Sequence, residues 1–287
     1  MTGRRELLAG AVRRLAEAGL PSPRADAEML LAHVTGRDRG ALVLLDEVDA
    51  EQGRAYAALL ARRAAREPLQ HLTGRAWFRT VELAVGPGVF VPRPETELLA
   101  GWALERLAEQ LVGAVHGLAP VAVDLGTGSG AIAAALAAEC PRAEVHAVEL
   151  DPQAHAWAER NLVSTGVDLR HGDLADAFDD LAGTVDVVVS NPPYIPLEAG
   201  ESVATEARDH DPHLALFSGD DGLDAVRVLV RRAAVLLRPG GWVGIEHADV
   251  QGESVPALLA ATGRFEQVRD HDDLAGRARF TTARLAR

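Results

Sequence analysis

Strand-like and helix-like segments alternate from Val121 to the end of the chain. Short apolar runs are followed by longer segments whose apolar residues recur at helical spacing. Such alternation predicts an α/β fold, in which helices pack on a largely parallel sheet. The expected strands are residues 121–125, 144–149, 167–171, 185–190, 241–246, 265–270 and 279–283, and the expected helices are 131–139, 152–165, 223–237 and 251–261. Because no helix fits between the last two strands, we expect these two to pair antiparallel.

The first 72 residues lack this alternation and predict a small all-helical domain. Helices are expected over residues 4–18, from Ser22-Pro23 to Val34, and over residues 50–66. The next segment, residues 73–95, predicts a connector with a β-hairpin built from residues 77–78, 81–85 and 89–91, and a helix should follow from 96 to about 111. The predicted domains are therefore residues 1–72, 73–95 and 96–287.

The composition argues against several classes of function. With a formal net charge of −13 and no lysine, direct nucleic-acid binding is not expected, because that binding relies on basic side chains. The single cysteine, Cys140, excludes an internal disulfide. Two histidines and two aspartates within residues 208–213 match no standard metal spacing, so we expect residues 207–222 to form a solvated loop and hold no metal. No apolar run is long enough to span a membrane, and a cytoplasmic location is expected.

A glycine-rich segment follows the first expected strand of the sheet. Its glycines allow a tight turn and let backbone N–H groups approach a ligand closely. Glu149 ends the next strand, where an acidic residue binds the ribose hydroxyls in nucleotide-binding folds. The absence of a lysine after the last glycine excludes a P-loop, whereas a dinucleotide and S-adenosylmethionine both fit the pattern. The candidate cofactor-binding residues are Asp124, Gly126, Thr127, Gly128, Ser129, Gly130 and Glu149.

The tetrapeptide Asn191-Pro192-Pro193-Tyr194 follows the buried strand 185–190. Two consecutive prolines stiffen the backbone and remove two N–H donors, which leaves carbonyl acceptors. The Asn191 side-chain oxygen and the Pro192 carbonyl can both accept hydrogen bonds from one NH₂ group, and Tyr194 can pack against it. A plain strand-ending turn is the alternative interpretation.

Two features favour S-adenosylmethionine as the cofactor. Asp124 lies two residues before Gly126, where its carboxylate can meet a cationic amino group. Asp173 and Leu174 follow the third strand of the sheet and are placed to contact the adenine, with Asp173 accepting from its amino group. A helix N-cap is the alternative role for Asp173.

Several stretches distributed over the chain carry a family resemblance. They are Gln70–Gly74, Val91–Glu97, Asp124–Ala131, Glu149, Ser190–Pro196, Gly240-Gly241 and Glu246-His247. Together they resemble the protein-(glutamine-N5) methyltransferases that modify peptide chain release factors, over nearly the whole chain. Asn-Pro-Pro-Tyr alone is shared with DNA adenine and rRNA guanine methyltransferases, whereas Pro-Arg-Pro-Glu-Thr-Glu and the N-terminal domain are more discriminating. Leu174 departs from relatives that carry an aromatic residue beside the adenine.

The resemblance implies a seven-stranded, Rossmann-like class I methyltransferase sheet and S-adenosylmethionine as methyl donor. The implied acceptor is the side-chain amide nitrogen of the glutamine in the Gly-Gly-Gln loop of a release factor. Asn191, Pro192 and Tyr194 are the expected catalytic residues, Pro193 adds to the acceptor site, and Asn191 also borders the cofactor. Asn191 and the Pro192 carbonyl would hold both N–H groups of the acceptor, and no general base is identifiable.

Other functions stay open at this point. They are a glutamine methyltransferase acting on a ribosomal protein, a nucleic-acid amino methyltransferase, an NAD-dependent oxidoreductase and a non-catalytic binding protein. We expect a monomer. Arg93 has two possible roles, at the cofactor edge or in an ion pair with Glu95 or Glu97. The pair Glu246-His247 can either touch the active site or cap the sheet.

Overall fold

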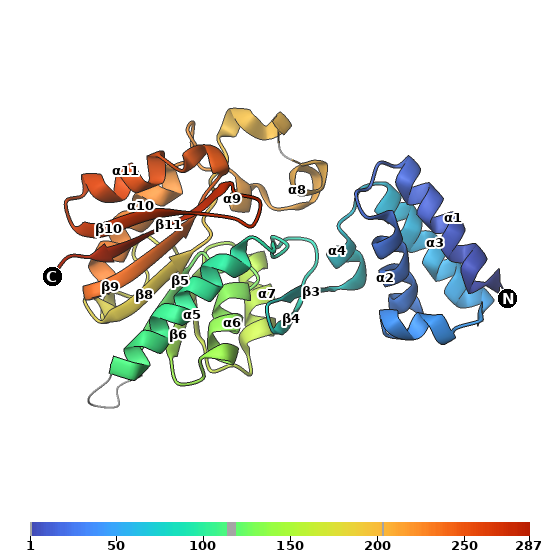
Figure 1. Ribbon diagram of the computed structural model, residues 1–287, viewed down its shortest axis with the longest axis horizontal. Helices are drawn as coiled ribbons and strands as arrows, with labels where there is room; N and C mark the ends of the chain where they lie inside the picture. The colour runs from blue at the N-terminus through green and yellow to red at the C-terminus, as the bar shows by residue number, and fades with distance from the viewer. Residues whose placement is uncertain (1, 114–118, 203) are drawn as a thin grey trace. The chain divides into compact units, whose positions relative to one another are not determined.

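The computed structural model describes residues 2–113, 119–202 and 204–287. Two compact units make up the chain (Figure 1). The first contains the residues up to Arg75 together with Ala204–His210, and the second contains the rest of the described residues. No helix in the described part of the chain combines the length and apolarity needed to cross a lipid bilayer.

The first unit is built mainly from helices. They are α1 (Arg4–Glu17), α2 (Pro23–Thr35), the 3-10 helix η1 (Arg39–Leu44), α3 (Ala50–Ala64) and α4 (Leu69–Thr73). Pro23 occupies the first turn of α2, and Gly36 ends this helix with a φ of 63°. The prediction of an all-helical domain missed one short antiparallel pair, β1 (Thr2–Gly3) with β2 (Glu47–Val48).

A buried ion pair joins two helices of this unit. Nε of Arg63 in α3 lies 2.7 Å from Oδ2 of Asp26 in α2, and the two side chains are only 6% and 10% exposed. The same guanidinium donates to the Glu67 carbonyl at 2.9 Å and lies 3.0 Å from the Glu206 carboxylate. Because its charge is satisfied on several sides, the buried arginine fastens α3 to α2.

The second unit contains the expected seven-stranded sheet, in the order β10-β11-β9-β8-β5-β6-β7 (Figure 1). Its strands are β5 (Val121–Leu125), β6 (Glu144–Glu149), β7 (Asp168–His171), β8 (Val185–Ser190), β9 (Leu237–Glu246), β10 (Phe265–Asp272) and β11 (Ala278–Leu285). Only β11 runs against the other strands of this sheet, and it pairs antiparallel with both β9 and β10. The predicted α/β class and the antiparallel final pair are confirmed.

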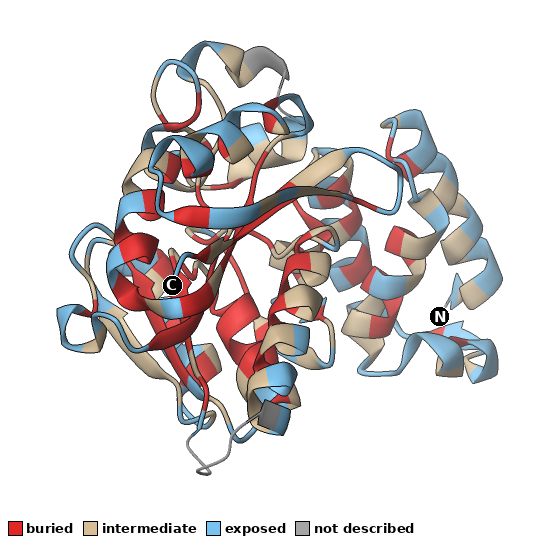
Figure 2. Ribbon diagram, turned by 60° about the vertical axis from the view of Figure 1, so that its left-hand side comes forward, coloured by how far each residue is buried: buried red, intermediate tan, exposed pale blue. Residues whose placement is uncertain are grey.

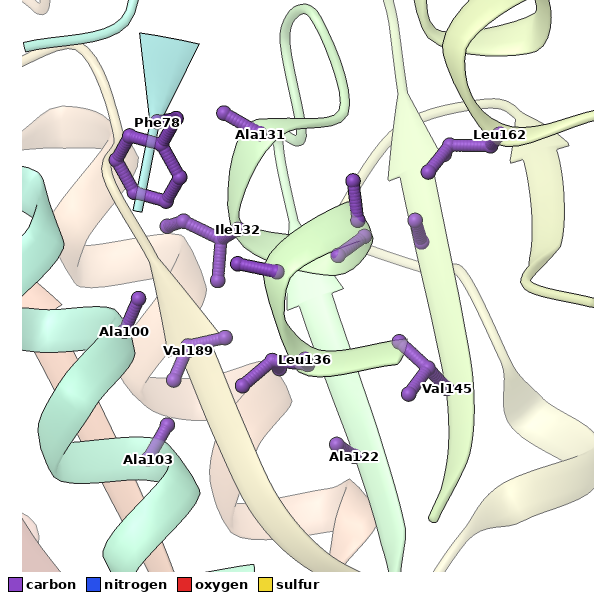
Figure 3. Packing of buried hydrophobic residues seen from close by; sticks show 14 of the residues in the cluster. Phe78, Ala100, Ala103, Ala122, Ala131, Ile132, Leu136, Val145, Leu162 and Val189 are labelled. Carbon is purple, nitrogen blue, oxygen red and sulfur yellow. The ribbon is translucent and has the colours of Figure 1, made fainter. Parts of the chain in front are cut away.

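Helices cover both faces of the sheet, which explains why its central strands β5 and β8 are mostly apolar. Ala122 of β5 and Val187 and Val189 of β8 pack with α5 (Thr96–Gly113), α6 (Ala131–Glu139) and α7 (Pro152–Leu162). Figure 3 shows part of this layer. Val123 and Val188 point to the other face, toward α10 (Asp224–Leu236) and α11 (Ser254–Ala261). Figure 2 shows the buried residues concentrated along the sheet and the helix sides that face it.

The connector differs from the prediction. Strands β3 (Arg75–Phe78) and β4 (Val81–Ala84) pair in a two-stranded sheet, but residues 89–91 form no strand. A Cβ on Gly86 or Gly88 would lie 2.7 Å from Trp157 or 2.3 Å from Gln153, both in α7. The segment therefore lies flat against α7, and Val89 and Val91 become buried without pairing in a sheet.

The region that follows β8 is also more ordered than expected. Residues 207–222 were predicted to form a solvated loop, but they include most of α8 (Thr205–His210) and all of α9 (His213–Leu216). Three further 3-10 helices occur among the described residues: η2 (Asp179–Leu181), η3 (Leu197–Ser202) and η4 (Asp249–Gln251). Asp211, between α8 and α9, is buried rather than solvated, which corrects the prediction for this segment.

Candidate active site

A cavity of about 330 Å³ opens at the carboxyl ends of the parallel strands in the second unit. Segments following β5, β6, β7 and β8 line it, so residues distant in sequence meet at one edge of the sheet. The strand order reverses between β5 and β8, and ligands of open α/β sheets bind at such a switch point. Its volume lies in the range of small-ligand pockets.

The glycine-rich segment forms the turn from β5 into α6. The amide groups of Gly126 and Thr127 donate to the Val148 carbonyl at 3.0 and 2.9 Å, which holds the turn against the end of β6. A Cβ on Gly128, whose φ is 58°, would meet nothing within 4 Å, whereas one on Gly130 would press on Leu162 at 3.0 Å. The two glycines therefore serve different purposes. Gly128 provides the backbone conformation beside the cavity, and Gly130 allows α7 to pack closely.

Glu149 supports this turn from the end of β6. Its Oε2 accepts from the Gly128 amide and its Oε1 accepts from the Asp151 amide, both at 2.8 Å. Burial raises the pKa of the Glu149 carboxyl, while the backbone donors at Asp151 and Gly128 oppose that rise. Each carboxylate oxygen has a further lone pair, so both oxygens can accept from hydroxyl groups in the cavity.

Asp124 lies beneath the turn and does not line the cavity. Its Oδ2 accepts from the Thr127 hydroxyl at 2.5 Å and from the Ala133 amide at 3.2 Å, which links β5, the turn and α6. Within the described residues, its Oδ1 has no hydrogen-bond partner. Burial raises the pKa of the fully enclosed Asp124 carboxyl to about 7. The predicted contact with a cationic amino group stays a prediction.

The Asn-Pro-Pro-Tyr turn begins where β8 meets β5. The buried Ser190 hydroxyl donates to the Leu125 carbonyl at 2.5 Å, which fixes the end of one strand to the other. Nδ2 of Asn191 donates to the Thr96 hydroxyl oxygen at 3.1 Å. The Tyr194 carbonyl accepts from the Gln251 side chain at 3.0 Å, and burial raises the pKa of the Tyr194 hydroxyl above its usual range.

The cavity brings together most of the predicted site residues but not all of them. Those that line it are Gly126, Thr127, Gly128, Ser129, Glu149, Asp173, Leu174, Asn191, Pro193 and Tyr194. Asp124, Gly130 and Pro192 lie outside its lining. Oδ1 of Asp173 accepts from the Ala175 amide at 2.9 Å, so this side chain stabilises its own turn as well as bordering the cavity.

Arg93 lines the cavity, and its partner was not predicted. The guanidinium lies 2.7 Å from the Asp211 carboxylate, whose side chain is 0% exposed, and it stacks over the Phe90 ring at 4.9 Å. The alternative of an ion pair with Glu95 or Glu97 is therefore wrong. Burial of the acid favours the pair, because an enclosed carboxylate needs a cation beside it.

Sequence reasoning missed several other residues of the cavity wall. They include Phe78, Phe90 and Thr96 from the connector and the start of α5, and Leu214, Leu216 and Phe217 in and after α9. Thr96 belongs to the Pro-Arg-Pro-Glu-Thr-Glu segment, which could have indicated a role near the site. The aromatic and leucine positions carry no local signal, since apolar residues are equally typical of core packing. No cluster of three or more potential metal ligands occurs among the described residues.

Comparison with known proteins identifies the family. Residues 6–74 match the PrmC N-terminal domain, and residues 103–208 match the methyltransferase small domain. The release factor glutamine methyltransferase of Streptomyces coelicolor is 57% identical over 279 residues, which cover 97% of each chain. The protein of the same name from Mycolicibacterium smegmatis is 46% identical over 290 residues and 100% of each chain.

This chain belongs to the release factor glutamine methyltransferase family. A member from Deinococcus radiodurans is 42% identical over 98% of each chain, so the similarity extends over the full length. Solved structures agree on the fold of the sheet. The hMettl16 catalytic domain aligns with a TM-score of 0.55 at 17% identity, covering 79% of this chain and 81% of that one. A methyltransferase from Pyrococcus furiosus gives 0.51 at 21% identity, covering 78% and 98%.

Proposed function

We propose that the chain transfers a methyl group from S-adenosylmethionine to the side-chain amide nitrogen of the glutamine in the Gly-Gly-Gln loop of peptide chain release factors. Membership of the release factor glutamine methyltransferase family supports this activity. The main observation in its support is that one cavity is lined by the glycine-rich turn with Glu149 and by the Asn-Pro-Pro-Tyr turn. A donor site and an acceptor site that share one cavity permit direct transfer.

The residues around the glycine turn fit the methyl donor. Gly126 and Gly128 border open space, since a Cβ at either position would meet nothing within 4 Å. Glu149 presents two oxygens that can accept from the ribose hydroxyls, and Asp173 and Leu174 are proposed to contact the adenine. When bound, S-adenosylmethionine supplies an electrophilic methyl group on a sulfonium. Asp124 and Gly130 support this turn from outside the cavity lining, and their proposed contact with the donor rests on the sequence pattern alone.

Asn191 is proposed to orient the acceptor amide. Its nitrogen donates to Thr96, which leaves its Oδ1 free to accept an N–H of the substrate. Holding that N–H turns the lone pair of the substrate nitrogen toward the donor, and the carbonyl dipole favours the positive charge that develops there. Tyr194 and Pro193 wall this end of the cavity and exclude water. For Pro192, the proposed contact of its carbonyl with the acceptor rests on the sequence pattern alone.

The acidic balance of the chain supports a protein substrate. The formal net charge is −13, and no basic groove is needed to bind a protein loop. We further propose that the enzyme acts as a monomer in the cytoplasm and contacts no nucleic acid directly.

Mass spectrometry of candidate substrates tests the proposal. Purified enzyme and donor are incubated separately with a release factor, with ribosomal proteins, and with DNA and rRNA. The proposal expects a gain of one methyl mass on the release factor, located at the Gly-Gly-Gln glutamine. A release factor whose glutamine is replaced by glutamate should remain unmodified. Methylation of a ribosomal protein or a nucleic acid in preference to the release factor would overturn the assignment.

A further inference from the structure

Glu246 is a buried acid that the mechanism above does not use. It ends β9 and is only 2% exposed. Ser190 and Ile245 pair across β8 and β9, which places Glu246 beside Asn191, and both Thr96 and Asn191 lower the pKa of its carboxyl group. Its Oε2 nevertheless has no hydrogen-bond partner among the described residues. A buried carboxyl that faces the turn of the active site and keeps an unused acceptor suggests a specific role.

The hydrogen-bonding capacities of these three side chains allow one consistent arrangement. An ionised carboxylate can only accept, whereas a hydroxyl donates one proton and accepts on its lone pairs. Thr96 can therefore donate to Glu246 while it accepts from Nδ2 of Asn191, at the observed 3.1 Å. Because Glu246 lies beside Asn191, the second N–H of Asn191 can donate to its carboxylate. Both N–H groups are then engaged, and only Oδ1 of Asn191 remains for the substrate.

We propose that Glu246 and Thr96 are positioning residues that hold the Asn191 carboxamide with its oxygen toward the acceptor. This inference rests on the proposed function, in which that oxygen binds the substrate amide. Without a fixed acceptor behind it, the carboxamide can rotate by half a turn and present its NH₂ group instead. Two donors would then face each other, and the substrate nitrogen would lose its orientation.

The ionisation of Glu246 adds a pH dependence to this arrangement. Burial raises the pKa of its carboxyl to about 7, with a smaller increase from Glu95, while Thr96, Arg279 and Asn191 oppose the rise. A protonated carboxyl becomes a donor and no longer enforces the orientation of Asn191. The other group facing Glu246 is Tyr194, whose raised pKa keeps it neutral near pH 7. Arg279 stays charged, because its pKa is also raised.

Turnover should consequently fall as the pH drops through about 7. Turnover decreases at low pH because only the ionised Glu246 carboxylate accepts hydrogen bonds on both oxygens and so fixes Asn191. Donor affinity should be largely independent of this titration, since Glu246 does not line the cavity.

Steady-state kinetics of Glu246→Gln, Thr96→Val and Thr96→Ser test the proposal. Glu246→Gln keeps the shape but can present an NH₂ group to Asn191, and Thr96→Val removes the bridging hydroxyl. Both should lower kcat by about 10- to 100-fold, and Glu246→Gln, whose side chain lies outside the cavity lining, should leave the donor Kd within about twofold. Thr96→Ser should restore most of the activity. Glu246→Gln should also lose the acidic limb of the pH profile, which a purely structural defect would not remove.

Two controls separate the possible failures. Thr282→Val removes another buried hydroxyl of the sheet, one that pairs with His271 at 2.8 Å, and should keep normal turnover. Asn191→Ala tests the underlying site. If Asn191→Ala is impaired but Glu246→Gln and Thr96→Val turn over normally with an unchanged pH profile, the positioning role is wrong and the proposed function stands. If Asn191→Ala itself turns over normally, the acceptor role of Asn191 fails and the positioning role fails with it.

Discussion

Replacing Glu149 by glutamine should weaken the binding of S-adenosylmethionine, because the carboxylate uses both of its oxygens. The two carboxylate oxygens accept from different backbone amides, those of Gly128 and Asp151, each at 2.8 Å. A glutamine has only one such oxygen, so either orientation of its side chain places an NH₂ group against an N–H donor. The variant also offers an acceptor to only one of the two ribose hydroxyls. No rotation of the amide repairs both losses.

The expected size follows from one hydrogen bond to a charged group. Such a bond contributes about 1.5–3 kcal/mol, which corresponds to a roughly 10- to 150-fold increase in Kd. Isothermal titration calorimetry with S-adenosylmethionine measures this change without requiring turnover. Glu144→Gln is a matched control, because Glu144 lies on the same strand but its side chain is 60% exposed and its carboxylate pairs with the His146 ring. Its Kd should be unchanged.

A normal donor Kd for Glu149→Gln would show that the ribose hydroxyls bind elsewhere and that Glu149 serves only to hold the glycine turn. If Glu149→Gln and Glu144→Gln raised the donor Kd equally, the cause would be a general effect of negative charge on β6.

Three further predictions concern other parts of the chain. Asn191→Ala should lower turnover by roughly 10²–10³ with little change in donor Kd, measured by single-turnover methylation and calorimetry. Asp124→Asn should gain stability relative to the wild type as the pH rises. Burial raises the pKa of the folded Asp124 carboxyl from 3.8 to about 7, so the folded state holds a proton that the unfolded chain releases. The stability of the wild type is therefore unaffected by this group below pH 3.8 and decreases as the pH rises from there to about 7. Urea unfolding at several pH values measures the difference from Asp124→Asn. Asp26→Ala should cost about 3 kcal/mol in unfolding free energy, because it leaves the buried Arg63 without its closest carboxylate. An Asp26→Ala unfolding curve that matches the wild type would contradict the last prediction.

The sheet could be predicted because its strands carry a strong local signal. β5 and β8 begin and end at the predicted residues, since both are valine-rich runs buried on two faces. β9 was placed at 241–246, yet it begins at Leu237. Pro239-Gly240 is typical of a turn, and Gly240 does adopt a φ of 83°. The strand continues through it with a shift in register against β8, between Val185 and Val187.

The site was predictable where its residues follow strands of a parallel sheet. Glu149 and the glycine turn are separated by about 20 residues, but adjacent parallel strands bring their carboxyl ends together. The partners that position these residues come from longer range. Arg93 and Asp211 are 118 residues apart, and Thr96 and Asn191 are 95 apart. Local pattern contains no information on such pairs, because each depends on how α5, β8 and the segment around α9 pack.

A crystal structure of the chain with S-adenosylmethionine bound would show whether the donor and acceptor sites meet as proposed. We expect both ribose hydroxyls to donate to Glu149, and Oδ1 of Asn191 to face the methyl group across a space that can hold an acceptor amide. A complex in which Asn191 points away from the methyl group, or in which the ribose hydroxyls leave Glu149 untouched, would contradict this expectation.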